Sequence, residues 1–302
     1  MILAVNRKED VKMKTCISLY SYWTPVRFGK MTQYDVIDRI KELGIDAVEL
    51  LMLNDAVPAG ETMQSYAKKL YEHATKIGLE VPILSMDSKL YCADPERELA
   101  YLCSMIDVAA ECGIKLMRFD IAYSYMGNEE LKNYKTVINA VAPYIRRLAD
   151  YGESRGVKVV SENHGSIIQD SYRVEELLTT VDHKNYGYLC DIGNFDGADE
   201  NSVSAVSRLL PYICFVHAKD IIQRSGNEYD PGKHYWRTRG GNFHRATIFG
   251  HGTLPIYQIL YALKQNGYEG YLSLEYEGIE DTDMAMEISA ENLKRMLEDL
   301  EK

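Results

Sequence analysis

Four side chains of the types that bind metal ions each follow a short apolar run in the second half of the chain. They are Glu162 after VKVVS, Asp191 after YGYLC, His217 after YICFV and Glu275 after YLSL. If they meet, the three carboxylates repel one another, and a divalent cation removes that conflict. Three carboxylates and one imidazole suit Mn²⁺, Mg²⁺ or Co²⁺, with Zn²⁺ as a further candidate. We therefore expect a divalent metal site, with Mn²⁺ as the first choice, where the ion can polarise a carbonyl group.

The alternation of side chains along a β-strand predicts which of these residues share a face. In a barrel strand every second residue points inward, so each polar residue continues the inward row of its own strand. The predicted inward rows are Val160, Glu162 and His164; Phe215, His217 and Lys219; and Ser273, Glu275 and Glu277. The glutamates, the histidines and Lys219 therefore point into one common opening.

Eight β-type runs and eight helical stretches alternate along the chain and must position these residues. The runs are Thr15–Trp23, Ala47–Leu51, Val81–Met86, Lys115–Ile121, Val157–Glu162, Tyr186–Asp191, Tyr212–His217 and Tyr271–Glu275. The helical stretches are Tyr34–Leu43, Thr62–Ile77, Pro95–Glu111, Glu129–Arg155, Val174–Thr180, Ser202–Leu210, Leu254–Gln265 and about Asp283 to Leu300. Strict alternation predicts a parallel sheet with helices outside.

The number of units favours a single-domain (β/α)₈ TIM barrel, whose active site lies at the carboxyl ends of the strands. An open, doubly wound sheet is the alternative, but GxGxxG does not follow the first run, and the polar residues lie at the ends of many strands. We expect residues 1–12 to be an N-terminal lead-in and 13–302 to be the barrel. A long connection, 219–252, is expected to lie over the site, because connections of this length in compact domains are usually functional.

The composition excludes several classes of protein. The chain is 46% hydrophobic with a net charge of −11 and without blocks of like charge, which disfavours binding to nucleic acid. The six cysteines form no CxxC pair, so we expect reduced thiols rather than a disulfide framework. The first residues, MILAVNRKED, become charged too early for a signal peptide, and no run approaches the ~18 apolar residues of a membrane span. We expect a soluble cytoplasmic protein that does not bind membranes.

Six segments in order along the chain also resemble a known family. They are GIDAVELL (44–51), VVSENHG (159–165), LCDIGN (189–194), FVHAKD (215–220), FGHGTLP (249–255) and GYEGYLSLEYEG (267–278). The chain is similar to the xylose-isomerase-like TIM-barrel superfamily, the sugar isomerase and epimerase group that also includes AP endonucleases and inosose dehydratases. The resemblance implies that Glu162, Asp191, His217 and Glu275 are metal ligands. It also implies that Glu162 and Glu275 move the proton next to a carbonyl.

Two departures from the family pattern bear on the reaction. Asn194 stands where the epimerases often carry a histidine, and Gln223, with Arg224 beside it, stands where they often carry an arginine. Both family residues usually hold substrate oxygens. Their replacement favours a second reading, in which His164 is an added acid or base and the reaction breaks a bond.

Further residues have both a functional and a structural interpretation. Lys219 either binds a substrate oxygen or phosphate or is a solvated lysine, and Trp23 and Trp236 either stack on the substrate or pack. Arg118 and Asp120 favour an internal ion pair, and Glu49 a buried network. The basic residues of the long connection form either a phosphate clamp or solvated pairs: Arg237, Arg239, His244 and Arg245. We expect Lys219, Asn194, Arg224 and Trp23 to contact the substrate.

The leading prediction is a metal-dependent isomerase or epimerase of a sugar or sugar phosphate, with Glu162, Glu275 and His164 as catalytic residues. The alternative is a lyase that uses the same enolate chemistry, either an inosose-type dehydratase or a C-glycoside deglycosidase of 3-oxo-glycosides. An AP endonuclease is disfavoured because the third and fourth strands end with Asp87 and Asp120 rather than histidine. A sugar-binding protein without activity is disfavoured by the intact ligand set. We expect a carbohydrate substrate and an oligomer, formed with a second copy or with a different subunit.

Overall fold

The computed structural model describes residues 12–126 and 133–302. Almost all of the predicted lead-in, residues 1–11, and the first residues of the helix predicted from Glu129 lie outside this range. Within it, no helix is both long enough and apolar enough to cross a membrane.

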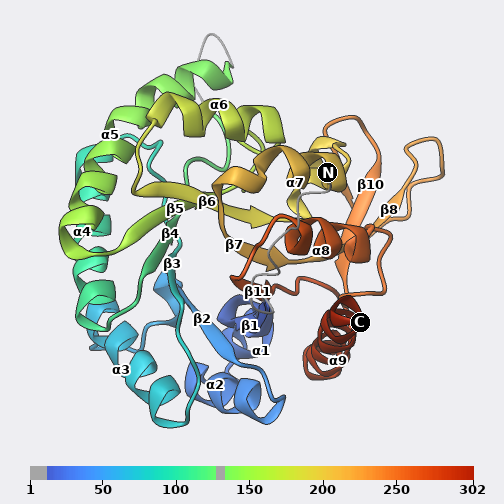
Figure 1. Ribbon diagram of the computed structural model, residues 1–302, viewed down its shortest axis with the longest axis horizontal. Coiled ribbons are helices and arrows are strands. Elements are labelled where there is room, and N and C mark those ends of the chain that lie inside the picture. Colours follow the sequence, from blue (N-terminus) through green and yellow to red (C-terminus); the bar gives the residue numbers. More distant parts are fainter. Residues whose placement is uncertain (1–11, 127–132) are drawn as a thin grey trace, which may run out of the picture.

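The described residues form a closed barrel of parallel strands with helices around it, which confirms the predicted TIM barrel (Figure 1). The barrel strands are β1 Lys14–Ser18, β2 Ala47–Met52, β3 Ile83–Met86, β4 Leu116–Phe119, β5 Lys158–Glu162, β6 Tyr186–Asp191, β7 Ile213–Ala218 and β11 Tyr271–Leu274. Their order around the barrel is β1-β11-β7-β6-β5-β4-β3-β2, and β2 closes the ring by pairing with β1. The strands that carry the four predicted ligands are therefore neighbours.

The helices follow the predicted pattern closely. They are α1 Trp23–Arg27, α2 Gln33–Glu42, α3 Met63–Lys76, α4 Pro95–Glu111, α5 Tyr134–Arg155, α6 Ser171–Val181, α7 Ser202–Leu209, α8 Ile256–Gln265 and α9 Thr282–Glu301. Local signals explain their ends: Asp94 accepts a hydrogen bond from the Arg97 N–H with Pro95 as the first helical residue, and α5 ends at Gly156 with φ 71°. Short 3₁₀ turns η1 to η4 span Leu19–Tyr22, Asn54–Ala56, Asn194–Ala198 and Leu210–Tyr212.

The first strand is shorter than predicted. It ends at Ser18 rather than Trp23, because the Ser18 side chain accepts a hydrogen bond from the Tyr20 N–H and starts the η1 turn. Periodicity could not show this end, since apolar residues continue through the turn with only Ser18 and Ser21 between them. Trp23 consequently begins the short helix α1 and does not end a strand.

The connection 219–252 contains an antiparallel sheet that the sequence analysis did not predict. Its strands are β8 Asp220–Arg224, β9 Trp236–Arg237 and β10 Phe243–Thr247, in the order β8-β10-β9, and Figure 1 shows β8 and β10 projecting from one side of the barrel. Only Lys219 separates β7 from β8. The Asp220 carboxylate holds both ends of the excursion together, since its Oδ2 accepts the N–H groups of Gly250 (2.9 Å) and Gly252 (2.8 Å).

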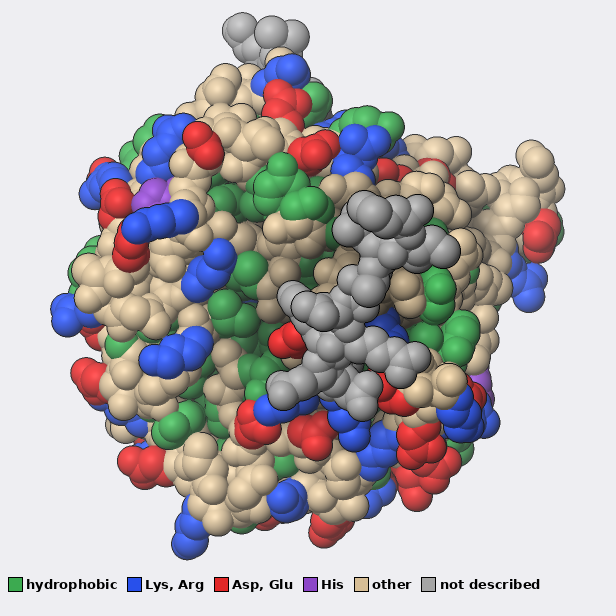
Figure 2. All heavy atoms as spheres, viewed as in Figure 1, with side chains coloured by type: hydrophobic (Ala, Val, Ile, Leu, Met, Phe, Trp, Pro, Cys, Tyr) green, Lys and Arg blue, Asp and Glu red, His purple; other side chains and the backbone are tan. Residues whose placement is uncertain are grey.

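Two apolar regions surround the strands. A large core fills the space between the sheet and the helices. A smaller cluster fills the lower part of the barrel interior, which is the part further from the carboxyl ends of the strands. The smaller cluster consists of Cys16, Ala47, Ile83, Val160, Leu189 and Phe215, all fully buried. On the outer surface, basic and acidic side chains are interspersed over the face seen in Figure 2 and do not gather into a patch of one sign.

Candidate metal centre

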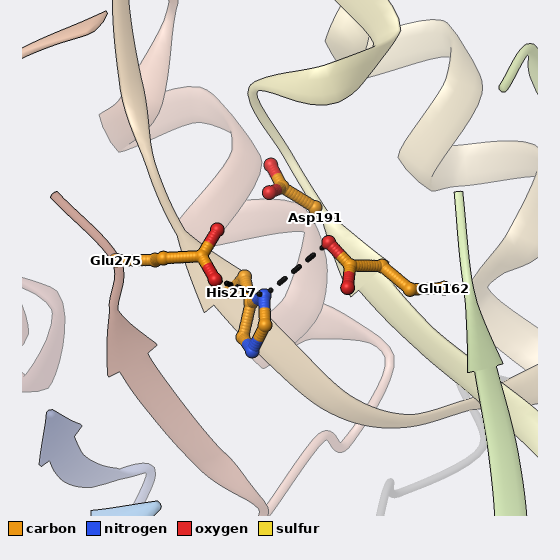
Figure 3. A group of neighbouring side chains, drawn as sticks. All are labelled: Glu162, Asp191, His217 and Glu275. Atoms are coloured by element: carbon orange, nitrogen blue, oxygen red, sulfur yellow. Dashed lines mark ion pairs between the residues drawn. The ribbon is translucent and has the colours of Figure 1, made fainter. Parts of the chain in front are cut away.

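The four predicted ligands converge at the carboxyl end of the barrel (Figure 3). Glu162 ends β5, Asp191 ends β6, His217 lies in β7 and Glu275 directly follows β11. One ligand atom from each residue lies within 4.8 Å of the others. Glu162 and Glu275 approach His217 from opposite sides, and each places an Oε1 at 3.4 Å from its Nδ1. Buried at these distances, the set offers a divalent ion three carboxylates and one imidazole.

Glu49 orients the histidine of this set. The His217 Nε2 lies 2.9 Å and 3.1 Å from the two carboxylate oxygens of Glu49, which also accepts hydrogen bonds from the Ser85 and Ser273 hydroxyls. With Nε2 held in this way, Nδ1 faces the carboxylates and makes no hydrogen bond with any described residue. A carboxylate behind a ligand histidine is a common support of metal sites. This orphaned, buried Nδ1 shows that the residues fit a metal ion.

The surroundings shift the pKa values of the candidate ligands in different directions. Burial would raise the pKa of the Glu162 carboxyl, but Arg118 and His217 hold it well below its usual range. Burial raises the pKa of Asp191 to about 7, although Lys219 opposes the shift. Burial would lower the pKa of His217, but Glu275 and Glu49 raise it. Without a metal, protons and basic side chains therefore neutralise the carboxylates, and a bound cation would displace a proton.

Lys219 lies inside this cluster. Its Nζ is 2.9 Å from Asp191, 2.6 Å from Glu275 and 3.3 Å from Glu277, and its side chain is 4% exposed. The interpretation as a solvated lysine is therefore wrong. Burial would lower the pKa of Lys219, but Asp191 and Glu275 keep it well above its usual value. An ammonium group thus contacts two of the four candidate ligands.

The opposite wall carries a second charged group around Asp120. Arg118 is 2.8 Å from Asp120, which confirms the predicted ion pair, and it also contacts Glu162. The His164 Nδ1 lies 3.0 Å from the Asp120 carboxylate, and its Nε2 has no hydrogen-bond partner among the described residues. Tyr123 hydrogen-bonds to Asp120 at 3.1 Å and packs edge-on against His164 at 4.6 Å. Asp120, Glu162 and His164 form a second group whose ligand atoms lie within 4.8 Å of one another, with the Arg118 guanidinium bridging its two carboxylates.

A cavity of about 360 Å³ opens above these groups, a size at the lower end for small-molecule sites. It is lined by Trp23, Glu162, His164, Lys219 and Glu275 among the predicted site residues. Arg118 and Tyr123, which were not predicted to contact substrate, also line it. Asn194 lies behind it, between Glu162 (3.2 Å) and Lys219 (3.3 Å).

Arg224 and the basic residues of the connection 219–252 (the insertion) do not line this cavity. Arg224 is half exposed beside Glu228 and borders a different hollow, on the side of β8. The four basic residues pair with separate carboxylates: Arg237 with Asp230, Arg239 with Asp170, His244 with Asp196 and Arg245 with Glu280. This dispersal does not support the phosphate clamp.

The sequence family agrees with the fold and the site. The family described as "Xylose isomerase-like TIM barrel" matches residues 37–298, and the chain belongs to it. An inosose dehydratase of Clostridium perfringens is 28% identical over 156 residues, 51% of this chain and 50% of that protein. The chain therefore spans about half the length of the curated relatives it matches.

Solved structures share the fold at low sequence identity. A D-tagatose 3-epimerase-like protein superposes with a TM-score of 0.70 at 20% identity, covering 96% of this chain and 98% of that one. The IOLI protein, described with a bound zinc atom, gives a TM-score of 0.72 at 15% identity, covering 95% and 99%. At these identities the likeness shows the barrel alone.

Proposed function

We propose that this protein is a divalent-metal-dependent enzyme that moves a proton next to the carbonyl of a sugar or sugar phosphate, as an isomerase or epimerase. One observation carries the proposal: two buried carboxylates, Glu162 and Glu275, flank the free Nδ1 of His217 at 3.4 Å on either side. A carboxylate on each side of a substrate supplies a base and an acid. Similarity to an inosose dehydratase supports an enzyme, and the zinc described in the IOLI structure supports a metal site. Mn²⁺ remains our first choice for a set rich in oxygen ligands.

When bound, the metal polarises the substrate carbonyl and so acidifies the neighbouring C–H. Side chains of the protein transfer the proton and hold the substrate. Glu162, held ionised by Arg118, takes the proton, and Glu275 on the other side returns one to the opposite face or to the next carbon. The Lys219 ammonium, fixed by Asp191 and Glu275, donates a hydrogen bond to a substrate oxygen. Trp23, which lines the same cavity, covers a face of the sugar.

The second candidate is a lyase on oxo-sugars, and the Asp120–His164 pair favours it. Removal of the proton next to a ketone leaves an electron pair that can expel a substituent on the β-carbon. His164 lines the cavity with its Nδ1 held by Asp120, so Nε2 is available to give a proton to the leaving group. The products are an unsaturated oxo-sugar and the protonated leaving group. A dehydratase loses water in this step, and a C-glycoside deglycosidase loses the carbon-linked group of a 3-oxo-glycoside.

Isotope exchange tests both candidates. Protein loaded with Mn²⁺ is incubated in D₂O with a panel of ketoses, with inosose and with a 3-oxo-glycoside. Deuterium in recovered or epimerised ketose supports the isomerase, whereas water loss or release of the linked group supports the lyase. Metal-stripped protein and Glu275→Gln should be inactive in either case. Absence of exchange and of elimination with every substrate, despite bound metal, would refute both.

A further inference from the structure

A side groove of about 290 Å³ opens beside the metal cavity. Tyr20, Trp23, Trp236 and Tyr276 contribute its rings, and Ser21, Thr24 and Thr282 its aliphatic hydroxyls. Tyr20, Trp23 and Glu277 line both the groove and the metal cavity, so the two spaces are adjacent and share a wall. The side groove is therefore the nearest space for a group carried by a substrate at the metal.

The two indole rings of the groove are not stacked on another ring. Trp23 and Trp236 are the two tryptophans of the chain, and neither indole makes a ring contact, a cation–π contact or a side-chain hydrogen bond with the described residues. Trp236 is 57% exposed although it is large and apolar. The insertion places it there, since the two-residue strand β9 pairs Trp236 with His244 of β10. An exposed aromatic ring beside a cavity is a common feature of binding sites.

Several polar groups of the groove are engaged with the protein itself. The Ser21 hydroxyl donates to the Leu274 carbonyl (3.0 Å) and accepts the Tyr276 N–H (3.1 Å). The Tyr276 hydroxyl hydrogen-bonds to Glu280, and Glu277 is paired with Lys219. The polar groups that remain for a second sugar ring are mainly the hydroxyls of Thr24 and Thr282. A flat apolar ring would find the faces of two indoles.

We propose that the side groove binds an aromatic ring carried by the sugar that reacts at the metal centre, so that the substrate class is aryl-sugar conjugates. This assignment rests on the proposed function in its lyase form, since a sugar whose anomeric carbon carries the ring keeps a carbonyl only as an oxo-sugar. Aromatic rings stack on indoles in offset or edge-to-face arrangements, and each such pair strengthens binding by about threefold to tenfold. In this assignment the sugar binds in the metal cavity, and the aromatic ring that it carries binds in the side groove.

Indole fluorescence tests the assignment directly, because both tryptophans line the groove. Metal-loaded protein is titrated with phenyl β-D-glucoside, with glucose and with cellobiose, which carries a second sugar in place of the phenyl ring. We expect phenyl glucoside to change the emission saturably and to bind about threefold to tenfold more tightly than the other two. Trp236→Ala should remove most of this difference and Trp236→Phe should keep part of it, with Trp23 as the remaining reporter. Tyr229→Ala, at a 95% exposed position of the same insertion, is the matched control.

The outcomes separate the groove from the reaction. Equal binding of phenyl glucoside and glucose, or tighter binding of cellobiose, would overturn the aromatic assignment. So would a phenyl preference that persists in Trp236→Ala. The titration needs no turnover, whereas the deuterium experiment on wild-type protein decides the proposed function. A failure of one therefore cannot be mistaken for a failure of the other.

Discussion

The interior of the barrel has two layers of opposite character, built by the same strands. Strand β5 supplies Val160 to the apolar lower layer and Glu162 to the charged upper layer, and β7 supplies Phe215 and His217 in the same way. The two layers are one inward step, two residues, apart. The lower layer stabilises the fold by burying apolar surface, whereas the upper layer buries charges that cost free energy unless they are paired. Along each strand, the inward residue further from the carboxyl end stabilises the fold, and the next inward residue belongs to the candidate site.

The largest expected effect is on activity, in the upper layer. Glu275→Gln removes one of the two opposed carboxylates and should lower turnover by about 10²–10⁴-fold. The free energy of unfolding should fall by about 1–3 kcal/mol, because the buried Lys219 and His217 lose a charged partner while the new amide still accepts a hydrogen bond. Exchange kinetics, elemental analysis and urea denaturation measure the three quantities. Glu287→Gln, at an exposed position of α9, is the control. A large loss of stability in Glu275→Gln would contradict the separation of the layers.

The next effect is on stability, in the lower layer. Ile83→Ala leaves a cavity among fully buried residues and should lower the free energy of unfolding by about 2–5 kcal/mol. The metal content of the folded protein should stay the same, because Ile83 lies one inward step below Ser85, the residue that contacts Glu49. Urea denaturation and elemental analysis of the same preparation make the test. Loss of metal from protein that is still folded would show that the layers are coupled.

A smaller effect is expected where the layers meet, at Glu49. Glu49→Gln should weaken Mn²⁺ binding by about 10–100-fold, because it removes the carboxylate that orients His217. Calorimetric titration of metal-stripped protein gives the affinity. Glu80→Gln, which changes a carboxylate that bonds Lys14 on the barrel surface, should bind as the wild type does. Unchanged affinity in Glu49→Gln would mean that β7 alone orients the histidine.

The smallest effect distinguishes the two proposed reactions. Asp120→Asn weakens the hydrogen bond that positions His164 and should slow elimination from an oxo-sugar by about tenfold. Proton exchange into the substrate should slow less, because Glu162 and Glu275 remain. The ratio of elimination to exchange is therefore the informative measurement, and Asp87→Asn, at the other carboxylate bonded to Tyr123, is the control. An equal loss of both rates would argue that Asp120 acts only through Arg118 and Glu162.

Much of the fold and of the candidate site follows from periodicity. Alternation along each strand predicts the inward rows, and the order of strands in a barrel makes β5, β6, β7 and β11 neighbours, so the four candidate ligands meet. The contact between Arg118 and Glu162 could not be predicted in this way, because it depends on how β4 and β5 are staggered. The burial of Lys219 depends on carboxylates from two segments far apart in the sequence, the end of β6 and the residues directly after β11.

The insertion shows the limit of the same reasoning. A two-residue strand such as β9 is too short to have a period, and β8 runs on from β7 almost without a break, so the pattern looked like one long loop. The sequence indicates Trp23 and Trp236 as candidates to stack on the substrate, but for this reason it does not predict the groove that they share. Its signal in the sequence was composition rather than pattern, since Trp236 is one of two tryptophans and lies in a polar segment.

The single carboxylate of Asp220 that joins the two ends of this excursion has an evolutionary consequence. Because Gly250 and Gly252 return to the residue where the chain left the barrel, the segment between them can lengthen, shorten or be replaced without moving β7 or its histidine. Both ends of the segment between Asp220 and Gly252 are therefore anchored at one residue next to the barrel. Related barrels could differ in this segment, and so in the groups that border the cavity, while the candidate metal ligands stay in place.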